Sequence, residues 1–212
     1  MAVSGPRMLV AERFKVRPMT LADIPQVVEV EHESFPTTWP QTAYRRELSS
    51  KIARYIVLVD NANPLTRSEL QGPRRSILRM FRRREEEPAS TDRVVGYVGM
   101  WLMVDQAHIV AIAVRERYRG QGLGELLLAQ AVQVAIDSNV ESVTLEVRRS
   151  NAPAQALYEK YRFLKVAVRA RYYSDNHEDA IIMTTPPIQD PAYAEHLRYL
   201  KEAYRQRWDR EI

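Results

Sequence analysis

Residues 112 to 124 read Ile112-Ala113-Val114-Arg115-Glu116-Arg117-Tyr118-Arg119-Gly120-Gln121-Gly122-Leu123-Gly124. The segment leaves an apolar strand, turns, and opens a helix whose leucines recur at helical spacing. Three glycines at alternate positions let the backbone approach a ligand closely. Unpaired N–H groups at a helix N-terminus attract anions, and Arg117 and Arg119 add positive charge. We therefore expect this glycine loop to hold a phosphate or pyrophosphate group.

Two common phosphate-binding motifs do not fit the loop. A Walker loop ends in Gly-Lys-Ser/Thr, whereas Gly124 is followed by Glu125. A Rossmann fingerprint needs the spacing G-x-G-x-x-G in the first βαβ unit with an acidic residue further on, and none of these conditions is met. The remaining alternative to an anion site is a glycine-rich turn without a ligand.

Outward from the loop, apolar periodicity predicts strands and helices in the order β-α-α-β-β-β-α-β-α-β-β, followed by a tail helix. This order is typical of a mixed α/β or α+β layer, with a central sheet and helices on its faces. The tail helix carries an aromatic and apolar stripe that packs on its own domain or forms a partner surface. The predicted strands are 14–17, 52–60, 94–104, 107–114, 142–147, 163–172 and 179–184, and the helices are 20–34, 40–48, 122–138, 152–161 and 191 onward.

Composition divides the chain into a domain and its appendages. We expect a flexible N-terminus over 1–12, one domain over 13–185, and a helical extension over 186–212. Within the domain, 61–92 holds prolines and an Arg-rich run, which favours a surface insertion. The net charge is +4, and much of the basic excess lies in this insertion. It is either a solvated excursion or a docking patch for RNA or an acidic protein.

Several classes of protein are excluded by residues that are missing. With no Cys, the chain has no disulfide scaffold, thiolate nucleophile or Cys-ligated metal site. The four histidines have no metal-binding spacing, and no nucleophile-elbow serine occurs, so neither a metal site nor a covalent acyl-enzyme is expected. No stretch approaches the roughly 18 apolar residues that span a bilayer, and no signal peptide is visible, which favours a cytoplasmic protein without a membrane partner.

The glycine loop resembles the acetyl-CoA pyrophosphate loop of the GNAT superfamily of N-acetyltransferases. That family's pattern, Arg/Gln-x-x-Gly-x-Gly/Ala, is matched by Arg119, Gly122 and Gly124. The segment Thr144-Leu145-Glu146-Val147-Arg148-Arg149-Ser150-Asn151, with Tyr158 after it, is similar to the ribosomal-protein-alanine branch, which acetylates protein N-terminal α-amines. The resemblance spans about 13–185. It implies the GNAT fold, a mixed and mostly antiparallel seven-stranded sheet flanked by helices, to which this chain adds the tail helix.

The resemblance also implies that acetyl-CoA is the acetyl donor, with no metal required. In the family, the strand before the loop offers backbone groups to pantetheine and to the thioester carbonyl, and Asn151 hydrogen-bonds pantetheine or caps its helix. The expected donor-binding residues are Ile112, Ala113, Val114, Arg117, Arg119, Gly120, Gln121, Gly122, Leu123, Gly124, Glu125 and Asn151.

Two residues are candidates for proton transfer. Glu146 lies in an otherwise apolar strand, where burial is expected to raise the pKa of its carboxyl toward neutrality and suit it to general-base work. By resemblance it accepts the amine's proton; the alternative is a carboxylate paired with Arg148 or facing solvent. By resemblance Tyr158 gives a proton to the departing CoA thiolate; the alternative is a core aromatic.

The resemblance places the substrate's first residues in a groove lined by aromatic side chains. The expected lining residues are Phe35, Pro36, Trp39, Tyr172 and Tyr173. His108 opens the strand that leads to the loop, and it either orients the substrate or fills the sheet edge. The expected partner is a protein N-terminus, of a ribosomal protein by resemblance.

Three alternatives to this function remain open. The first is an acetyltransferase for internal lysine or a small-molecule amine. The second is an RNA- or ribosome-binding protein that acts through its Arg-rich insertion, and the third is a degenerate acyl-CoA sensor. The sequence also departs from the family once, because Arg162 stands where Gly precedes the Phe of Leu-Tyr-x-x-x-Gly-Phe. A left-handed conformation there costs a non-Gly residue about 1 kcal/mol.

Overall fold

The computed structural model describes residues 13–36, 40–66, 69 and 90–210, without the side chains of the last two. Most of the predicted insertion and the whole of the predicted flexible N-terminus lie outside these residues. The strands are β1 (Phe14–Pro18), β2 (Ala53–Asp60), β3 (Val94–Leu102), β4 (Gln106–Val114), β5 (Ser142–Arg148), β6 (Leu164–Arg169) and β7 (Ala180–Thr184). The helices are α2 (Ile24–Ser34), α3 (Gln41–Leu48), α5 (Leu123–Asp137), α6 (Ala152–Lys160) and α7 (Pro191–Arg210).

The strands form one seven-stranded sheet in the order β1-β2-β3-β4-β5-β7-β6. Neighbours pair antiparallel except β4 and β5, which are parallel and are joined through α5. The expected fold class, a mixed and mostly antiparallel sheet with flanking helices and a C-terminal helix, is confirmed.

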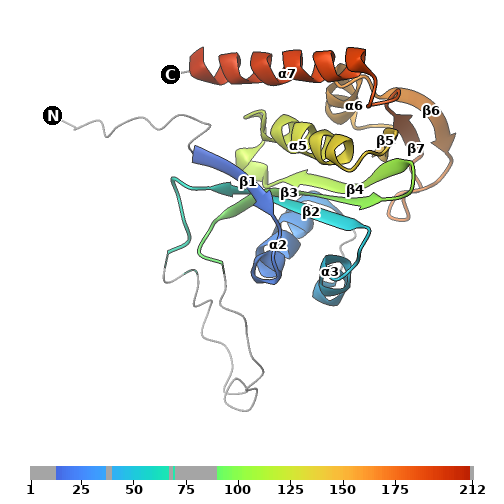
Figure 1. Ribbon diagram of the computed structural model, residues 1–212. Helices are drawn as coiled ribbons and strands as arrows, with labels where there is room; N and C mark the ends of the chain where they lie inside the picture. Colours follow the sequence, from blue (N-terminus) through green and yellow to red (C-terminus); the bar gives the residue numbers. More distant parts are fainter. Residues whose placement is uncertain (1–12, 37–39, 67–68, 70–89, 211–212) are drawn as a thin grey trace.

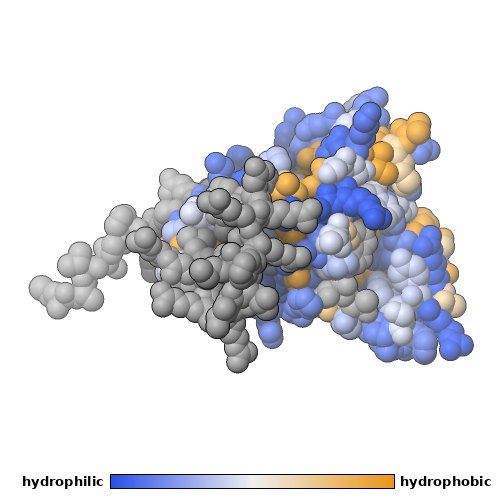
Figure 2. All heavy atoms as spheres, turned by 90° about the horizontal axis from the view of Figure 1, so that it is seen from below, coloured by the Kyte–Doolittle hydropathy of each residue, from blue (hydrophilic) through white to orange (hydrophobic). Residues whose placement is uncertain are grey.

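Helices cover both faces of the sheet (Figure 1). On one face, α2 and α3 bury Ile24, Val27, Val30 and Tyr44 against β2 and β3. On the other face, α5 buries its leucine stripe against the sheet, because those leucines recur on one side of the helix. Seen from the α2–α3 side, hydrophobic groups form separate patches among hydrophilic ones (Figure 2).

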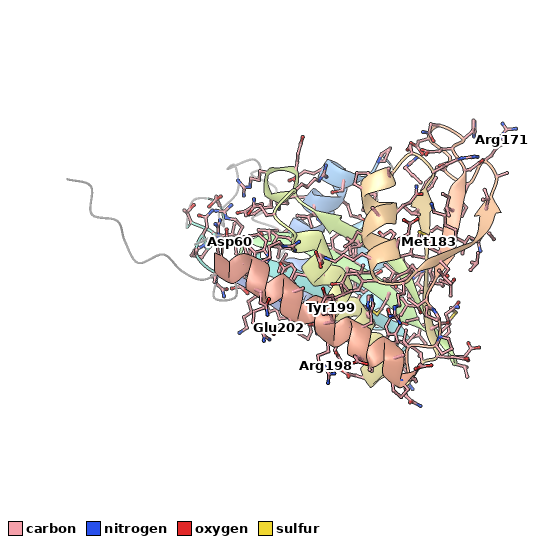
Figure 3. All side chains as sticks on the ribbon, turned by 90° about the horizontal axis from the view of Figure 1, so that it is seen from above. Asp60, Arg171, Met183, Arg198, Tyr199 and Glu202 are labelled. Carbon is pink, nitrogen blue, oxygen red and sulfur yellow. The ribbon has the colours of Figure 1, made fainter. Side chains whose placement is uncertain are left out.

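The tail helix α7 lies across α5 on the side away from the sheet (Figure 1). Its residues Tyr193, Leu197 and Leu200 are buried in the same core as the α5 leucines. The aromatic stripe of the tail therefore packs on its own domain. Arg198, Tyr199 and Glu202 also lie on this helix (Figure 3), and Tyr199 is exposed. In the part of the chain that the structure covers, no helix has the length and apolar character needed to cross a bilayer.

The two parallel strands separate partway along their length. Pairing between β4 and β5 runs only from Gln106↔Ser142 to Ile109↔Leu145, although β4 continues to Val114 and β5 to Arg148. Val110 has no partner in the register between β3 and β4, where the pairing shifts, so it forms a bulge where the β4–β5 pairing ends. A bulge bends its strand, and the result is a fork between the C-terminal halves of β4 and β5.

Candidate functional site

A cavity of about 560 Å³ occupies the fork between β4 and β5. Its walls come from both strands, from the end of α2, from α6 and from the β6–β7 connection. The cavity brings together most of the side chains expected for catalysis and substrate binding. Those that line it are Phe35, Pro36, His108, Glu146, Asn151, Tyr158, Tyr172 and Tyr173, together with Ile112 from the expected donor site.

Glu146 lies at the centre of this arrangement with two basic partners. His108 Nε2 lies 2.6 Å from Glu146 Oε2, and an Arg169 guanidinium nitrogen lies 3.0 Å from Glu146 Oε1. The side chain of Glu146 is 11% exposed, so water reaches it only in part. The predicted alternative, a pair with Arg148, is not formed, because Arg148 binds Asp175 and Glu178 instead.

The pKa expected for Glu146 is wrong in direction. The hydrogen bond from His108 lowers the pKa of the Glu146 carboxyl, and the positive charge of Arg169 adds to this effect, whereas partial burial opposes it. The sequence showed the apolar neighbours of Glu146 in its own strand but not the two bases from β4 and β6. Glu146 is therefore an ionised carboxylate near neutral pH. It can attract an ammonium group, and it can accept a proton from a donor group that is more acidic than a free ammonium.

His108 is held by an aromatic neighbour. The Trp101 ring lies edge-on to His108, with 5.9 Å between ring centroids. Trp101 donates its indole N–H to Glu47 at 2.6 Å, and the Tyr55 hydroxyl donates to the same Glu47 oxygen at 3.3 Å. This set of contacts fixes the imidazole against Glu146.

Tyr158 lines the same cavity from α6. The residue is only 6% exposed, and its ring packs against Phe163. Burial raises the pKa of its hydroxyl well above the ordinary value, so the group keeps its proton throughout the physiological range. Within the described residues, no hydrogen bond engages this hydroxyl. Tyr158 is therefore a core aromatic that also lines the cavity, and its role as a proton donor stays a prediction.

The β6–β7 connection is tied to β5 through Arg148. This guanidinium lies 3.8 Å from the centre of the Tyr173 ring and bonds Asp175 at 2.8 Å. Tyr172 packs edge-on against Tyr173, with 5.2 Å between centroids. Both tyrosines thereby line the outer part of the cavity, as expected for a groove.

The glycine loop presents free backbone donors. The N–H of Leu126 is the first in α5 to bond within the helix, to the Gly122 carbonyl, so the amides of 123–125 have no intrahelical acceptor. Gly120 and Gly122 have φ of 76° and 69°, which only glycine adopts without strain. A Cβ placed on Gly120 or Gly124 meets nothing within 4 Å. The open space above these two residues and the free amides fit a phosphate group.

Several side chains of the loop make contacts within the protein, and their predicted contact with the donor is not tested by these contacts. The Arg119 guanidinium bonds the Val114 carbonyl and the Ser34 hydroxyl, so it joins the loop to the end of α2. Leu123 and Ala113 are buried in the core and offer a ligand only their backbone. The carboxylate of Glu125 points away from the open side of the loop, toward α6 and α7. Arg117 stacks over Tyr118 at 5.1 Å, while Gln121 remains at the surface beside it.

Asn151 caps α6, and its contact with pantetheine stays a prediction. Its Oδ1 accepts the N–H of Ala154 at 3.2 Å, which caps α6, and the residue also lines the cavity. Arg162 has φ of 60°, so the end of α6 keeps the left-handed turn that the family makes with Gly. Trp39 lies outside the described residues. The described residues contain no group of three or more His, Asp or Glu side chains arranged to hold a metal ion.

The sequence reasoning missed more than half of the cavity residues, among them Glu31, Tyr44, Tyr55 and Trp101. The apolar pattern of β2 and β3 assigns Tyr55 and Trp101 to the core. The polar ends of the four named residues form hydrogen bonds, among them Tyr97 to Glu31 at 3.0 Å. A polar tip on a residue in an otherwise apolar run is the one signal that could have identified them.

Comparison with known proteins extends this picture. Residues 24–163 match the family model described as the acetyltransferase (GNAT) family. A Bacillus subtilis protein, provisionally assigned as a ribosomal protein bS18-alanine N-acetyltransferase, is 34% identical over 169 residues, which cover 79% of this chain and 92% of that protein. An N-alpha-acetyltransferase of Saccharolobus solfataricus is 33% identical over 186 residues, covering 84% and 99%.

A solved structure shares the fold. The ribosomal-protein-S18-alanine N-acetyltransferase of Escherichia coli superposes with a TM-score of 0.63 at 24% sequence identity, over 82% of this chain and 94% of that one.

Proposed function

The chain belongs to the acetyltransferase (GNAT) family, and from that premise we propose that it transfers the acetyl group of acetyl-CoA to the N-terminal α-amine of a protein. The observation that carries the proposal is the position of Glu146 and Tyr158 in one cavity, a carboxylate and a protonated phenol at the β4–β5 fork. One can accept a proton and the other can donate one. Acetyl transfer from a thioester to an amine needs both.

The donor's position follows from the backbone. The free amides of 123–125 donate hydrogen bonds to the diphosphate of CoA, which occupies the open space above Gly120 and Gly124. Beyond Ile109 the edge of β4 that faces β5 has no strand partner. Its backbone groups hold the pantetheine arm, and an N–H there donates to the thioester oxygen as negative charge develops.

The reaction then proceeds by direct attack. The neutral amine forms a C–N bond to the thioester carbon, and the carbonyl oxygen becomes an oxyanion. Glu146 accepts the proton that the attacking nitrogen loses. When the C–S bond breaks, the hydroxyl of Tyr158 gives its proton to the leaving thiolate. Solvent then reprotonates the Tyr158 phenolate and takes up the proton held by Glu146, which restores both groups. No side chain carries the acetyl group, in keeping with the absence of Cys.

The lowered pKa of Glu146 favours an α-amine acceptor. An ionised carboxylate of low pKa is a weak base, so the acceptor must supply a neutral amine by itself. A terminal amine has a pKa of about 7.7–8.0 against about 10.4 for lysine, which makes its neutral form ~300-fold more available at pH 7. Arg169 and His108 next to Glu146 therefore support an α-amine over a lysine.

The substrate proposed here is the N-terminus of a ribosomal protein, with the alanine N-terminus of bS18 as the first candidate. Two similarities support it, to the Bacillus subtilis protein and to the Escherichia coli enzyme, whose names state that activity. Contact with nucleic acid through the Arg-rich insertion stays a prediction, because 70–89 lie outside the described residues.

Two peptides test the acceptor. One has a free N-terminal alanine and no lysine; the other has the same sequence blocked at its N-terminus and bears one internal lysine. With acetyl-CoA, we expect thiol release with the first peptide and at least 100-fold less with the second, following the difference in neutral amine. Equal rates, or a faster rate with the lysine peptide, would contradict the proposal. A panel that varies the first two residues then defines the preferred N-terminus.

A further inference from the structure

The C-terminal helix α7 extends along α5 to the glycine loop. Its contacts advance in order from the end of α5 to its beginning. Gln189, just before α7, bonds the carbonyls of Ile136 and Val140, and Lys201 bonds Gln133. Arg207 then bonds Glu125, in the first turn of α5, at 2.9 Å. The far end of α7 therefore lies against the proposed diphosphate site.

The loop has one open side and one packed side. A Cβ on Gly120 or Gly124 meets empty space, whereas a Cβ on Gly122 comes within 3.2 Å of both Arg207 and Trp208 and within 3.4 Å of Tyr204. The α7 side chains thus press on the back of the loop, opposite the side left open for the donor.

Glu125 gives this contact an electrostatic effect. The residue is 6% exposed, and its carboxylate is held by Lys160 at 2.5 Å and by Arg207 at 2.9 Å. Burial opposes its ionisation, but the bonds from Lys160 and Arg207 outweigh burial and keep its pKa below the ordinary value. An ionised carboxylate without these partners would place negative charge beside the amides that bind the diphosphate and would repel it.

Two further polar groups lie at the same contact. Among the described residues, the buried Tyr204 hydroxyl and Trp208 indole N–H bond no group outside this pair, and the two rings pack at 5.9 Å between centroids. Both side chains lie within 3.4 Å of a Cβ placed on Gly122, so this aromatic pair encloses the back of the loop.

We propose that α7 is a positioning element of the acyl-donor site: Arg207, with Lys160, neutralises Glu125, and the side chains of Tyr204, Arg207 and Trp208 fix the loop at Gly122, so that its amides bind the diphosphate of the donor. This inference rests on the proposed function for the identity of the donor. It adds residues 204–208, which lie outside the match to the family model at 24–163.

The experiment compares two donors and three variants with one peptide acceptor. Acetyl-CoA carries the diphosphate, and S-acetylpantetheine lacks it. In Arg207→Gln, we expect the KM for acetyl-CoA to rise about tenfold, the loss of one charge-assisted contact, with kcat within about twofold. The KM for S-acetylpantetheine should stay within about twofold. Arg207→Lys is the conservative control and should recover most of the affinity for acetyl-CoA.

The decisive variant is Glu125→Gln. It loses two ion pairs, so a purely structural role predicts weaker donor binding, whereas the removal of negative charge predicts CoA binding at least as tight as in the wild type. The double variant Glu125→Gln/Arg207→Gln should likewise return the KM for acetyl-CoA to within about threefold of the wild-type value. Weaker CoA binding in Glu125→Gln, or equal loss with both donors in Arg207→Gln, would overturn the proposal.

The two proposals fail separately. A wild-type protein that acetylates no peptide contradicts the proposed function. The same variants then still report on α7 through the dissociation constant of CoA, measured by titration calorimetry. If the wild type is active but the substitutions at Arg207 and Glu125 leave the dissociation constant of CoA unchanged, only the proposed role of α7 is contradicted.

Discussion

The two ends of the proposed site are built from different chemical groups. At the glycine loop, the available hydrogen-bond donors are the backbone amides of 123–125. The side chain of Leu123 is buried in the core, and that of Arg119 bonds Ser34. At the β4–β5 fork, the working groups are the side chains of Glu146, His108 and Tyr158. In the proposed function, the loop binds the acyl donor through backbone amides, whereas the fork acts through side chains that a single substitution removes. Changes at the fork should lower kcat, and changes at the loop should raise the donor's KM.

The largest effect is expected at the fork. Glu146→Gln keeps the size of the side chain but cannot accept a proton, so kcat should fall by roughly 10²–10⁴-fold. Tyr158→Phe should lower kcat less, by about 10- to 100-fold, because a thiolate leaves readily. Steady-state kinetics with acetyl-CoA and an alanine peptide measure both. If both variants keep kcat/KM within about threefold of wild type, less than ~1 kcal/mol, the assigned roles are wrong.

The pH dependence sharpens the reading of Glu146. Because His108 and Arg169 lower its pKa, the Glu146 carboxylate is already ionised at neutral pH. Its titration therefore produces no step in the profile of kcat/KM against pH near neutrality. The acceptor must lose its proton, so kcat/KM should rise with pH through about 7.7–8.0 and then level off. The same rise, with lower amplitude, is expected in Glu146→Gln. A step in kcat/KM between about pH 6 and 7 that is present in the wild type and absent in this variant would contradict the lowered pKa of Glu146. It would instead support the raised pKa predicted from the sequence.

At the loop, a substitution should act on binding. In Gly124→Val the new side chain meets no protein atom near its Cβ, so the fold should tolerate it. The side chain fills the space left for the diphosphate and should raise the KM for acetyl-CoA by about tenfold, the cost of one disturbed hydrogen bond to a charged group. Gly124→Ala is the smaller matched control. A fall in kcat with unchanged KM would remove the distinction between the two ends.

The smallest effect concerns stability and lies outside both ends. Arg162 holds φ of 60° at the end of α6. Arg162→Gly should stabilise the fold by about 1 kcal/mol without changing the kinetics. Thermal unfolding against Arg162→Ala, which keeps the strained conformation, provides the comparison. A glycine variant no more stable than the alanine variant would show that the neighbours of Arg162, and not its backbone, set the cost.

The sequence predicted local structure and the loop well, because both depend on short-range pattern. Apolar periodicity located all seven strands of the sheet, with ends shifted by a few residues. Glycine spacing predicted an anion site, and the unpaired amides and open space of the loop support that prediction. The β4–β5 fork could not be predicted from the sequence because it depends on a bulge at Val110. The apolar sequence of the strand contains no signal for a bulge at that position.

The side-chain environment was harder to predict because it depends on contacts between distant segments. Glu146 was identified, but the direction of its pKa shift came from His108, 38 residues before it, and from Arg169 on another strand. Glu125 was assigned to the donor site by its place in the loop, yet its carboxylate bonds Lys160 and Arg207. Tyr55 and Trp101 looked like core residues because their strands are otherwise apolar.

The central claim is that donor and acceptor occupy one cavity together and that the acetyl group passes directly between them. Initial rates over a matrix of acetyl-CoA and alanine-peptide concentrations test it. Reciprocal plots that intersect are predicted, since both substrates must be bound before either product leaves. Parallel lines would contradict the account, because they require an acetylated enzyme that releases CoA before the peptide binds.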